Sequence, residues 1–63
     1  MAVQFMDVKQ TAEFLSVSVQ WLYREAPRTG LASYKFGVGR NAKIRFKRSE
    51  VEVWVRQQRI SKT

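Results

Sequence analysis

Apolar side chains recur at helical spacing in the first part of the chain. Over residues 8–15 they lie three or four positions apart, as on one side of an α-helix. Asp7 stands directly before this stretch as an N-cap, and Gln10 completes a pattern like a capping box. Met6 is placed to act as a hydrophobic staple. We expect a helix over residues 8–15, preceded by an extended lead-in over residues 1–6.

A second stretch of helical spacing follows a short turn. Ser18 is placed to cap a helix over residues 19–26, in which Leu22 and Ala26 would face the first helix. Pro27 cannot donate a helical hydrogen bond and disfavours helical geometry at the residue before it. We therefore expect this helix to end at Ala26. Two short helices joined by a tight turn are the outline of a helix-turn-helix.

The spacing then changes to a period of two. Ile44 and Phe46 alternate with three cations, which predicts a strand with its apolar side toward the core. Tyr34 and Phe36 alternate with polar residues before a glycine-containing loop at residues 37–41. The pattern predicts a two-stranded antiparallel hairpin with one apolar face and one strongly basic face.

The last stretch returns to helical spacing. Ser49 and Glu52 form the Ser-x-x-Glu pattern of a capping box, directly before a stripe that includes Trp54. We expect a helix over residues 50–59 and fraying over residues 60–63.

The order helix, turn, helix, basic hairpin, helix predicts a winged helix-turn-helix. This fold is mainly α, with three helices and a small two-stranded antiparallel wing. The length of 63 residues allows a single domain, residues 1–63, with an ordered core over about residues 5–59. The expected core side chains come from the three helices and the second strand of the hairpin: Leu15, Leu22, Ile44, Phe46, Val51 and Trp54.

Charge separates the possible functions. Twelve Lys and Arg residues against five Asp and Glu residues give a net charge of +7. Between residues 26 and 49 there are cations and no acid: Arg28, Lys35, Arg40, Lys43, Arg45, Lys47 and Arg48. Such a stretch is typical of a surface that binds a polyanion. The alternative is a basic surface that only keeps the protein soluble.

Composition argues against catalysis and against a membrane protein. The chain has no Cys and no His, so it lacks a thiol nucleophile, a Cys/His metal site and the commonest general base. Among its five scattered acids, Asp7, Glu50 and Glu52 stand where helix starts are expected, so capping explains these three better than catalysis does. We expect no enzyme activity and no cofactor. No apolar run approaches the ~20 residues of a membrane span, and no signal-peptide pattern is present, which predicts a protein of the bacterial cytoplasm.

Several motifs resemble one known family. The segments Asp7–Ser18, Leu22-Tyr23-Arg24, Gly30 and Arg48–Trp54 occur with the basic hairpin in the order and spacing of the excisionase-like branch of MerR-type winged helix-turn-helix domains. The resemblance covers about residues 5–57. It implies a DNA-binding module like those of phage and mobile-element excisionases and small transcription regulators.

The chain departs from the family pattern in two places. The link at residues 26–29 contains a proline and is longer than usual. A long C-terminal dimerisation helix, which full-length MerR regulators carry, does not follow the third helix. We therefore expect no small-molecule effector.

The second helix is expected to enter the major groove with its N-terminal turns against the base edges. This places Ser18, Gln20, Trp21 and Arg24 nearest the DNA. Gln20 is suited to adenine, and Arg24 to guanine or a phosphate. The alternatives are a solvent-facing Gln20 and a Trp21 half-buried against the hairpin or the N-terminal strand.

The wing is expected to contact phosphates or the adjacent minor groove. Arg40, near the loop tip, suits insertion into a narrow minor groove. Tyr23 is expected to pack on the wing with its hydroxyl free to reach a phosphate, and a place in the core is the alternative. The remaining predicted contacts are cations: Arg28, Lys35, Lys43, Arg45 and Lys47.

The favoured function is that of an excisionase, or recombination directionality factor. It would bind double-stranded DNA at an attachment site, bend it, associate cooperatively and assist an integrase. A transcription regulator of a prophage or mobile element would use the same surface. A module that binds an acidic protein is a third hypothesis. Binding to single strands or RNA is the last, because Ile44 and Phe46 are needed in the core and no free stacking platform is evident.

Overall fold

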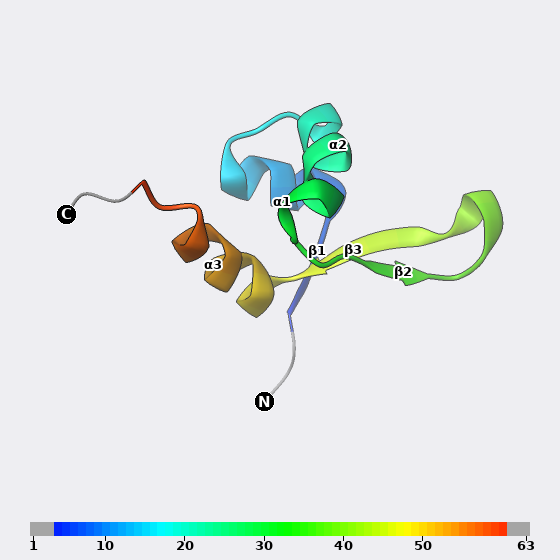
Figure 1. Cartoon of the computed structure of the whole chain (residues 1–63). Coiled ribbons are helices and arrows are strands. Elements are labelled where there is room, and N and C mark those ends of the chain that lie inside the picture. Colours follow the sequence, from blue (N-terminus) through cyan, green and yellow to red (C-terminus); the bar gives the residue numbers. More distant parts are fainter. Residues whose placement is uncertain (1–3, 61–63) are drawn as a thin grey trace.

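The computed structural model describes residues 4–60, arranged as three helices and three short strands (Figure 1). In chain order the elements are β1 (Phe5–Asp7), α1 (Val8–Leu15), α2 (Val19–Thr29), β2 (Tyr34–Phe36), a 3-10 helix (Gly39–Asn41), β3 (Lys43–Lys47) and α3 (Arg48–Gln57). The lead-in predicted at residues 1–3 and the fraying predicted at residues 61–63 lie outside the described residues. No helix of residues 4–60 is long and apolar enough to cross a membrane.

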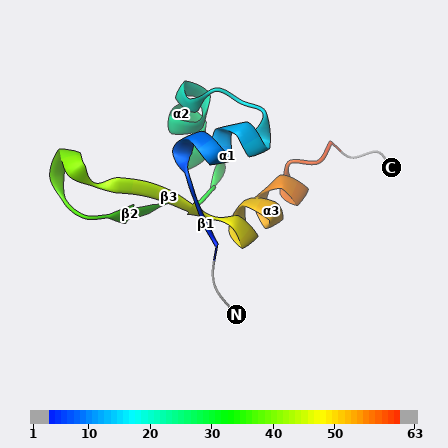
Figure 2. The ribbon, with the colours of Figure 1, turned by 180° about the vertical axis from the view of Figure 1, so that it is seen from behind.

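The sheet has three antiparallel strands in the order β1-β3-β2. The predicted hairpin of β2 and β3 is confirmed, but the lead-in at Phe5–Asp7 is also a strand, which pairs Met6 with Phe46. A strand of three residues carries too little period-two pattern to be recognised alone. In Figures 1 and 2, α1 and α2 lie together beside the sheet. Helix α3 lies at the end of the sheet away from the hairpin tip, and the hairpin projects away from all three helices.

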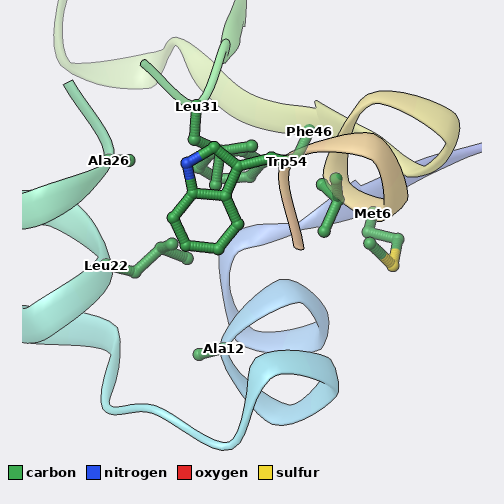
Figure 3. Packing of buried hydrophobic residues seen from close by; sticks show 8 residues of the cluster. Met6, Ala12, Leu22, Ala26, Leu31, Phe46 and Trp54 are labelled. Carbon is green, nitrogen blue, oxygen red and sulfur yellow. The ribbon is translucent and has the colours of Figure 1, made fainter. Parts of the chain in front are cut away.

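The core forms where α1, α2 and α3 meet the sheet (Figure 3). Its buried apolar side chains are Met6, Ala12, Leu22, Ala26, Leu31, Phe46, Val51 and Trp54. Four of the six predicted core residues are in this set, whereas Leu15 and Ile44 are half-buried and pack at its edge. Trp54 lies at the centre, and its Nε1–H donates to the carbonyl oxygen of Thr29 at 3.2 Å. This bond ties α3 to the C-terminal end of α2.

The start of α1 is as predicted. The Asp7 side chain accepts from the Gln10 backbone N–H at 2.7 Å, and the Gln10 side chain accepts from the Asp7 backbone N–H at 3.0 Å. The Thr11 hydroxyl, which is fully buried, donates to the carbonyl of Asp7 at 2.8 Å. Helix α1 ends at Ser16, whose left-handed backbone (φ 58°) turns the chain toward α2. Caps at both ends of α1 therefore fix the geometry of the turn.

The expected end of α2 at Ala26 is wrong, because the helix continues through Pro27 to Thr29. Proline in a helix removes one hydrogen bond to the carbonyl four residues earlier, here that of Tyr23. Both Tyr23 and Pro27 are exposed, so water can serve that carbonyl. On the buried side, the Leu31 N–H donates to the Ala26 carbonyl at 3.0 Å. Packing there outweighs the local cost of the proline.

The expected start of α3 is also wrong. The helix begins at Arg48 directly after β3, with Lys47 at the N-cap and no side-chain cap, and it ends at Gln57. Ser49 lies inside the first turn and does not form the predicted capping box. Pairing of β3 with β1 carries the chain straight into the helix, and the Arg48 N–H donates to the carbonyl of Gln4 at 2.9 Å. That backbone bond replaces a side-chain cap.

A long-range hydrogen bond fixes the sheet against α3. The Tyr34 hydroxyl donates to both carboxylate oxygens of Glu50, at 2.8 and 2.9 Å. This hydrogen bond, with smaller effects of burial and of the Glu50 charge, raises the pKa of Tyr34. A raised folded-state pKa means that the bond stabilises the fold fully below the unfolded pKa of about 10. The stabilisation is lost as the pH rises through the folded-state value.

We therefore expect Tyr34→Phe to lower the melting temperature by a constant amount up to about pH 9. The difference from the wild type should shrink above about pH 10, because the wild-type bond is then lost as well. Circular-dichroism melts across this range measure the difference. Tyr23→Phe, at an exposed position, is the matched control. A difference that does not change with pH would contradict the role of the Tyr34–Glu50 bond.

Candidate nucleic-acid interface

Helices α1 and α2 pack as the two helices of a helix-turn-helix. Thr11 and Ala12 of α1 and Leu22 and Ala26 of α2 are buried, and Val17 in the turn packs against the same cluster. The Ser18 hydroxyl oxygen accepts from the Trp21 N–H at 2.9 Å, which is the predicted N-cap of α2. This packing leaves the opposite side of α2 free for a ligand.

The free side of α2 carries the predicted base-reading residues. Gln20 and Arg24 lie one turn apart and are both exposed. Trp21 is half-buried and packs against the core, so its contact with DNA stays a prediction. Gln20 and Arg24 are therefore the polar side chains of α2 best placed to reach base edges.

Tyr23 lies beside the wing and not in the core. Its side chain is 58% exposed. It lines a cavity of about 170 Å³ between α2 and the hairpin, together with Pro27, Ser33 and Ile44. Tyr23 thus lies at the junction of α2 and the hairpin, and its contact with a phosphate stays a prediction.

Sequence reasoning missed Glu25, which contacts two of the predicted DNA-binding cations. Its Oε2 lies 3.0 Å from Nε of Arg24 and 3.7 Å from Nη1 of Arg28. The spacing of Glu25 and Arg28, three positions apart on a helix, was the available signal. One carboxylate thus partly neutralises two cations on the face of α2 that carries Gln20.

We expect Glu25→Gln to strengthen binding to duplex DNA of any sequence. The amide keeps the shape of the side chain, removes one negative charge and releases two exposed ion pairs, each worth about 0–1 kcal/mol. A gain of roughly 2- to 5-fold at low salt, shrinking as salt rises, should appear in anisotropy titrations. Glu52→Gln, which breaks the pair with Arg48 on α3, is the control. Weaker binding of Glu25→Gln would instead identify Glu25 as a base contact.

The register of the hairpin divides the wing cations between two faces. Lys35 pairs with Ile44, so it lies on the face that packs toward α2. Tyr34 pairs with Arg45 and Phe36 pairs with Lys43. The predicted basic face is therefore not purely basic, because two aromatic residues share it. The sequence of each strand shows which of its own residues share a face. Only the register between the strands shows that the aromatic residues of β2 lie on the same face as the cations of β3.

We call this second face the outer face of the sheet. By strand alternation it carries Phe5, Asp7, Tyr34, Phe36, Lys43, Arg45 and Lys47. Lys43 is exposed, while Arg45 and Lys47 are half-buried. The structure thus brings Gln20, Tyr23, Arg24 and Lys35 to one side of the molecule. It places Lys43, Arg45 and Lys47 on the other side of the sheet.

The tip of the wing is exposed and sharply turned. Gly37 and Gly39 have positive φ angles of 105° and 68°, which glycine adopts at low cost. Between them Val38 is 86% exposed, and Arg40 follows in the 3-10 helix, also exposed. An arginine beside an apolar residue at the end of a projecting hairpin is suited to enter a narrow groove.

Comparison with known proteins agrees with this geometry. Residues 5–59 match the family model described as "Helix-turn-helix domain". No curated protein and no solved structure gives a significant match. The matched residues include every helix and strand of residues 4–60.

Proposed function

The chain belongs to the helix-turn-helix domain family and is a sequence-specific DNA-binding protein, and from this premise we propose that it acts as an excisionase of a phage or mobile element. It would bind attachment-site DNA in the bacterial cytoplasm, bend it and assist an integrase. The motifs that resemble excisionase-like, MerR-type domains support this finer assignment. The domain family is one of DNA-binding modules.

The observation that carries the DNA-binding mode is the free side of α2 next to the projecting hairpin. In this mode α2 enters the major groove, Gln20 contacts adenine and Arg24 contacts guanine. Ser18 and Trp21, at the start of α2, lie near the DNA backbone in this mode. Tyr23 directs its hydroxyl to a phosphate at the junction with the wing.

The wing follows the duplex beside α2. Arg40 enters the adjacent minor groove, while Lys35 and Arg28 contact phosphates on the same side of the molecule. The cations of the outer face can contact a phosphate only where an edge of the hairpin lies along the DNA backbone. These cations are Lys43, Arg45 and Lys47. They therefore contribute mainly to the long-range attraction of the duplex.

Cooperation between copies is part of the proposal. A single small module with a few base contacts binds weakly, and neighbouring copies on adjacent sites raise the effective affinity. An array of copies is suited to the bending of an attachment site. A promoter-bound regulator with the same fold is the second candidate, supported by the same surface.

A gel-shift titration on duplexes tiled across the neighbouring genome tests the proposal. We expect a ladder of cooperative, bent complexes near an integrase gene, and stimulation of excision in a reconstituted reaction. One discrete complex at a promoter, with no effect on excision, would favour the regulator. Binding without sequence preference at any salt concentration would contradict the reading role of α2.

A further inference from the structure

The outer face of the sheet carries a cluster of aromatic side chains that the helix-turn-helix does not use. The Phe5 ring contacts Tyr34 and Phe36 edge to face, with centroids 5.5 Å apart in both pairs (interplanar angles 76° and 89°). Phe5 is 39% exposed and Phe36 is 48% exposed. Large aromatic rings grouped on a small exposed surface are typical of a binding site.

Contacts with α3 and across the sheet fix the positions of these rings. The Tyr34 hydroxyl is fixed by Glu50 at the start of α3, and Phe5 packs across β3 from the neighbouring edge strand. Tyr34 therefore cannot rotate freely. Its ring contacts Phe5, and Phe5 in turn contacts Phe36. The cluster is ordered before any ligand arrives, which lowers the entropic cost of binding.

Cations lie between the aromatic residues. Lys43, Arg45 and Lys47 occupy alternate positions of the central strand β3, about 6.8 Å apart along the strand. Asp7 pairs with Arg45 on this face and also caps α1, while Glu50 accepts from Tyr34, so the three cations share the face with one acid of the sheet. The outer face thus combines exposed rings on two edge strands with a row of positive charges between them.

We propose that this outer face binds single-stranded DNA, with unpaired bases stacked on Phe36 and Phe5 and the phosphates along Lys43, Arg45 and Lys47. Stacking of bases on aromatic side chains within a basic groove is the general basis of single-strand binding. Duplex DNA hides the faces of its bases within the stack, so it cannot use the rings. An acidic peptide would pair with the cations, but it does not offer a planar base at every unit of charge to stack on the rings.

The face is separate from the surface that we assign to the duplex. Strand alternation places Phe36 and Lys43 on one side of the hairpin, and Lys35 and Ile44 on the side of α2. A duplex on α2 therefore leaves the rings free, and a strand displaced from nearby DNA can reach them. The choice of DNA over RNA rests on the proposed function, whereas binding of single strands does not.

The test compares two labelled oligonucleotides of about 12 units, one of thymidine and one of abasic sugar phosphate with the same charge. Anisotropy titrations with the whole chain should show at least about 5-fold tighter binding of oligothymidine, because only it can stack. Equal affinity for the two would mean that the face binds charge alone, which overturns the proposal. Tighter binding of oligouridine than of oligothymidine would overturn the choice of DNA.

Matched variants locate the site. Phe36→Leu keeps an apolar strand residue but removes the ring, and should lower oligothymidine affinity about 5-fold or more while duplex affinity stays unchanged. Lys43→Gln and Lys35→Gln remove the same charge from opposite faces, so only the first should reduce oligothymidine binding strongly. Arg24→Ala should do the reverse of Phe36→Leu, weakening the duplex alone.

The outcomes separate the two proposals. Parallel losses for oligothymidine and duplex in all these variants would indicate one shared polyanion surface and overturn the second site. If the wild-type chain binds all duplex sequences equally but still binds oligothymidine, only the proposed base reading by α2 is contradicted. If Phe36→Leu does not fold, the wild-type comparison of oligothymidine with the abasic strand decides the matter by itself. Capture of an acidic peptide with no binding of oligothymidine would also overturn the proposal.

Discussion

Trp54→Ala is expected to leave the chain largely unfolded at room temperature. Trp54 is 8% exposed and its indole lies among Leu22, Leu31 and Phe46 (Figure 3). Truncation of a buried tryptophan to alanine costs about 3–5 kcal/mol. Stability of about 0.05–0.15 kcal/mol per residue gives a chain of 63 residues roughly 3–9 kcal/mol in total. The loss is therefore comparable with the whole free energy of unfolding.

Urea titration followed by circular dichroism measures this effect, and two variants separate its parts. Trp54→Phe keeps an apolar ring but removes the Nε1–H bond to Thr29, and should cost less than the truncation, about 1–2 kcal/mol. Val53→Ala, at the exposed neighbour on α3, should change stability by about 0.5 kcal/mol or less. A cooperatively folded Trp54→Ala variant with near wild-type stability would contradict the place of α3 in the core.

Arg24→Ala is expected to weaken binding to the preferred duplex by about 1–3 kcal/mol, or roughly 5- to 150-fold. Arg24 lies one turn after Gln20 on the free side of α2, and within residues 4–60 its one side-chain hydrogen-bond partner is Glu25. A bidentate contact to guanine would be lost without replacement. The variant should also lose its preference at one base pair, which is measured by titrating duplexes with single substitutions.

Arg28→Ala is the matched control because Arg28 shares the Glu25 carboxylate with Arg24. As a phosphate contact it should weaken binding to every sequence by a similar factor, and lower the salt dependence by about one unit. Similar behaviour of the two variants, with unchanged base preference in both, would show that Arg24 contacts only the backbone.

The sequence predicted the elements well where the signal is local. The bounds of α1, the Asp7–Gln10 capping box and the Ser18 cap all depend on residues about one helical turn apart. Alternation placed Phe46 in the core, and helical spacing placed Leu22, Val51 and Trp54 there. These patterns depend on the fixed periods of helices and strands, which do not change with the surroundings.

The sequence was misleading where a distant contact outweighs a local preference. Pro27 predicts a helix end, but burial of Ala26 and Leu31 keeps the chain helical to Thr29. Ser49 predicts a cap, but the pairing of β1 with β3 starts the helix earlier, at Arg48. Local preferences are worth about 1–3 kcal/mol, which packing on both sides of a short helix can exceed.

The family, the basic charge and the exposed side of α2 could all be predicted from the sequence. A helical period and a run of cations are properties of neighbouring residues, and they remain visible without a structure. The outer face of the sheet does not follow in this way. Phe5, Tyr34 and Arg45 come from three strands, and their meeting depends on pairing between positions that lie about 40 residues apart or across a loop. A shift of one residue would exchange the two faces, and only the packed core sets that register.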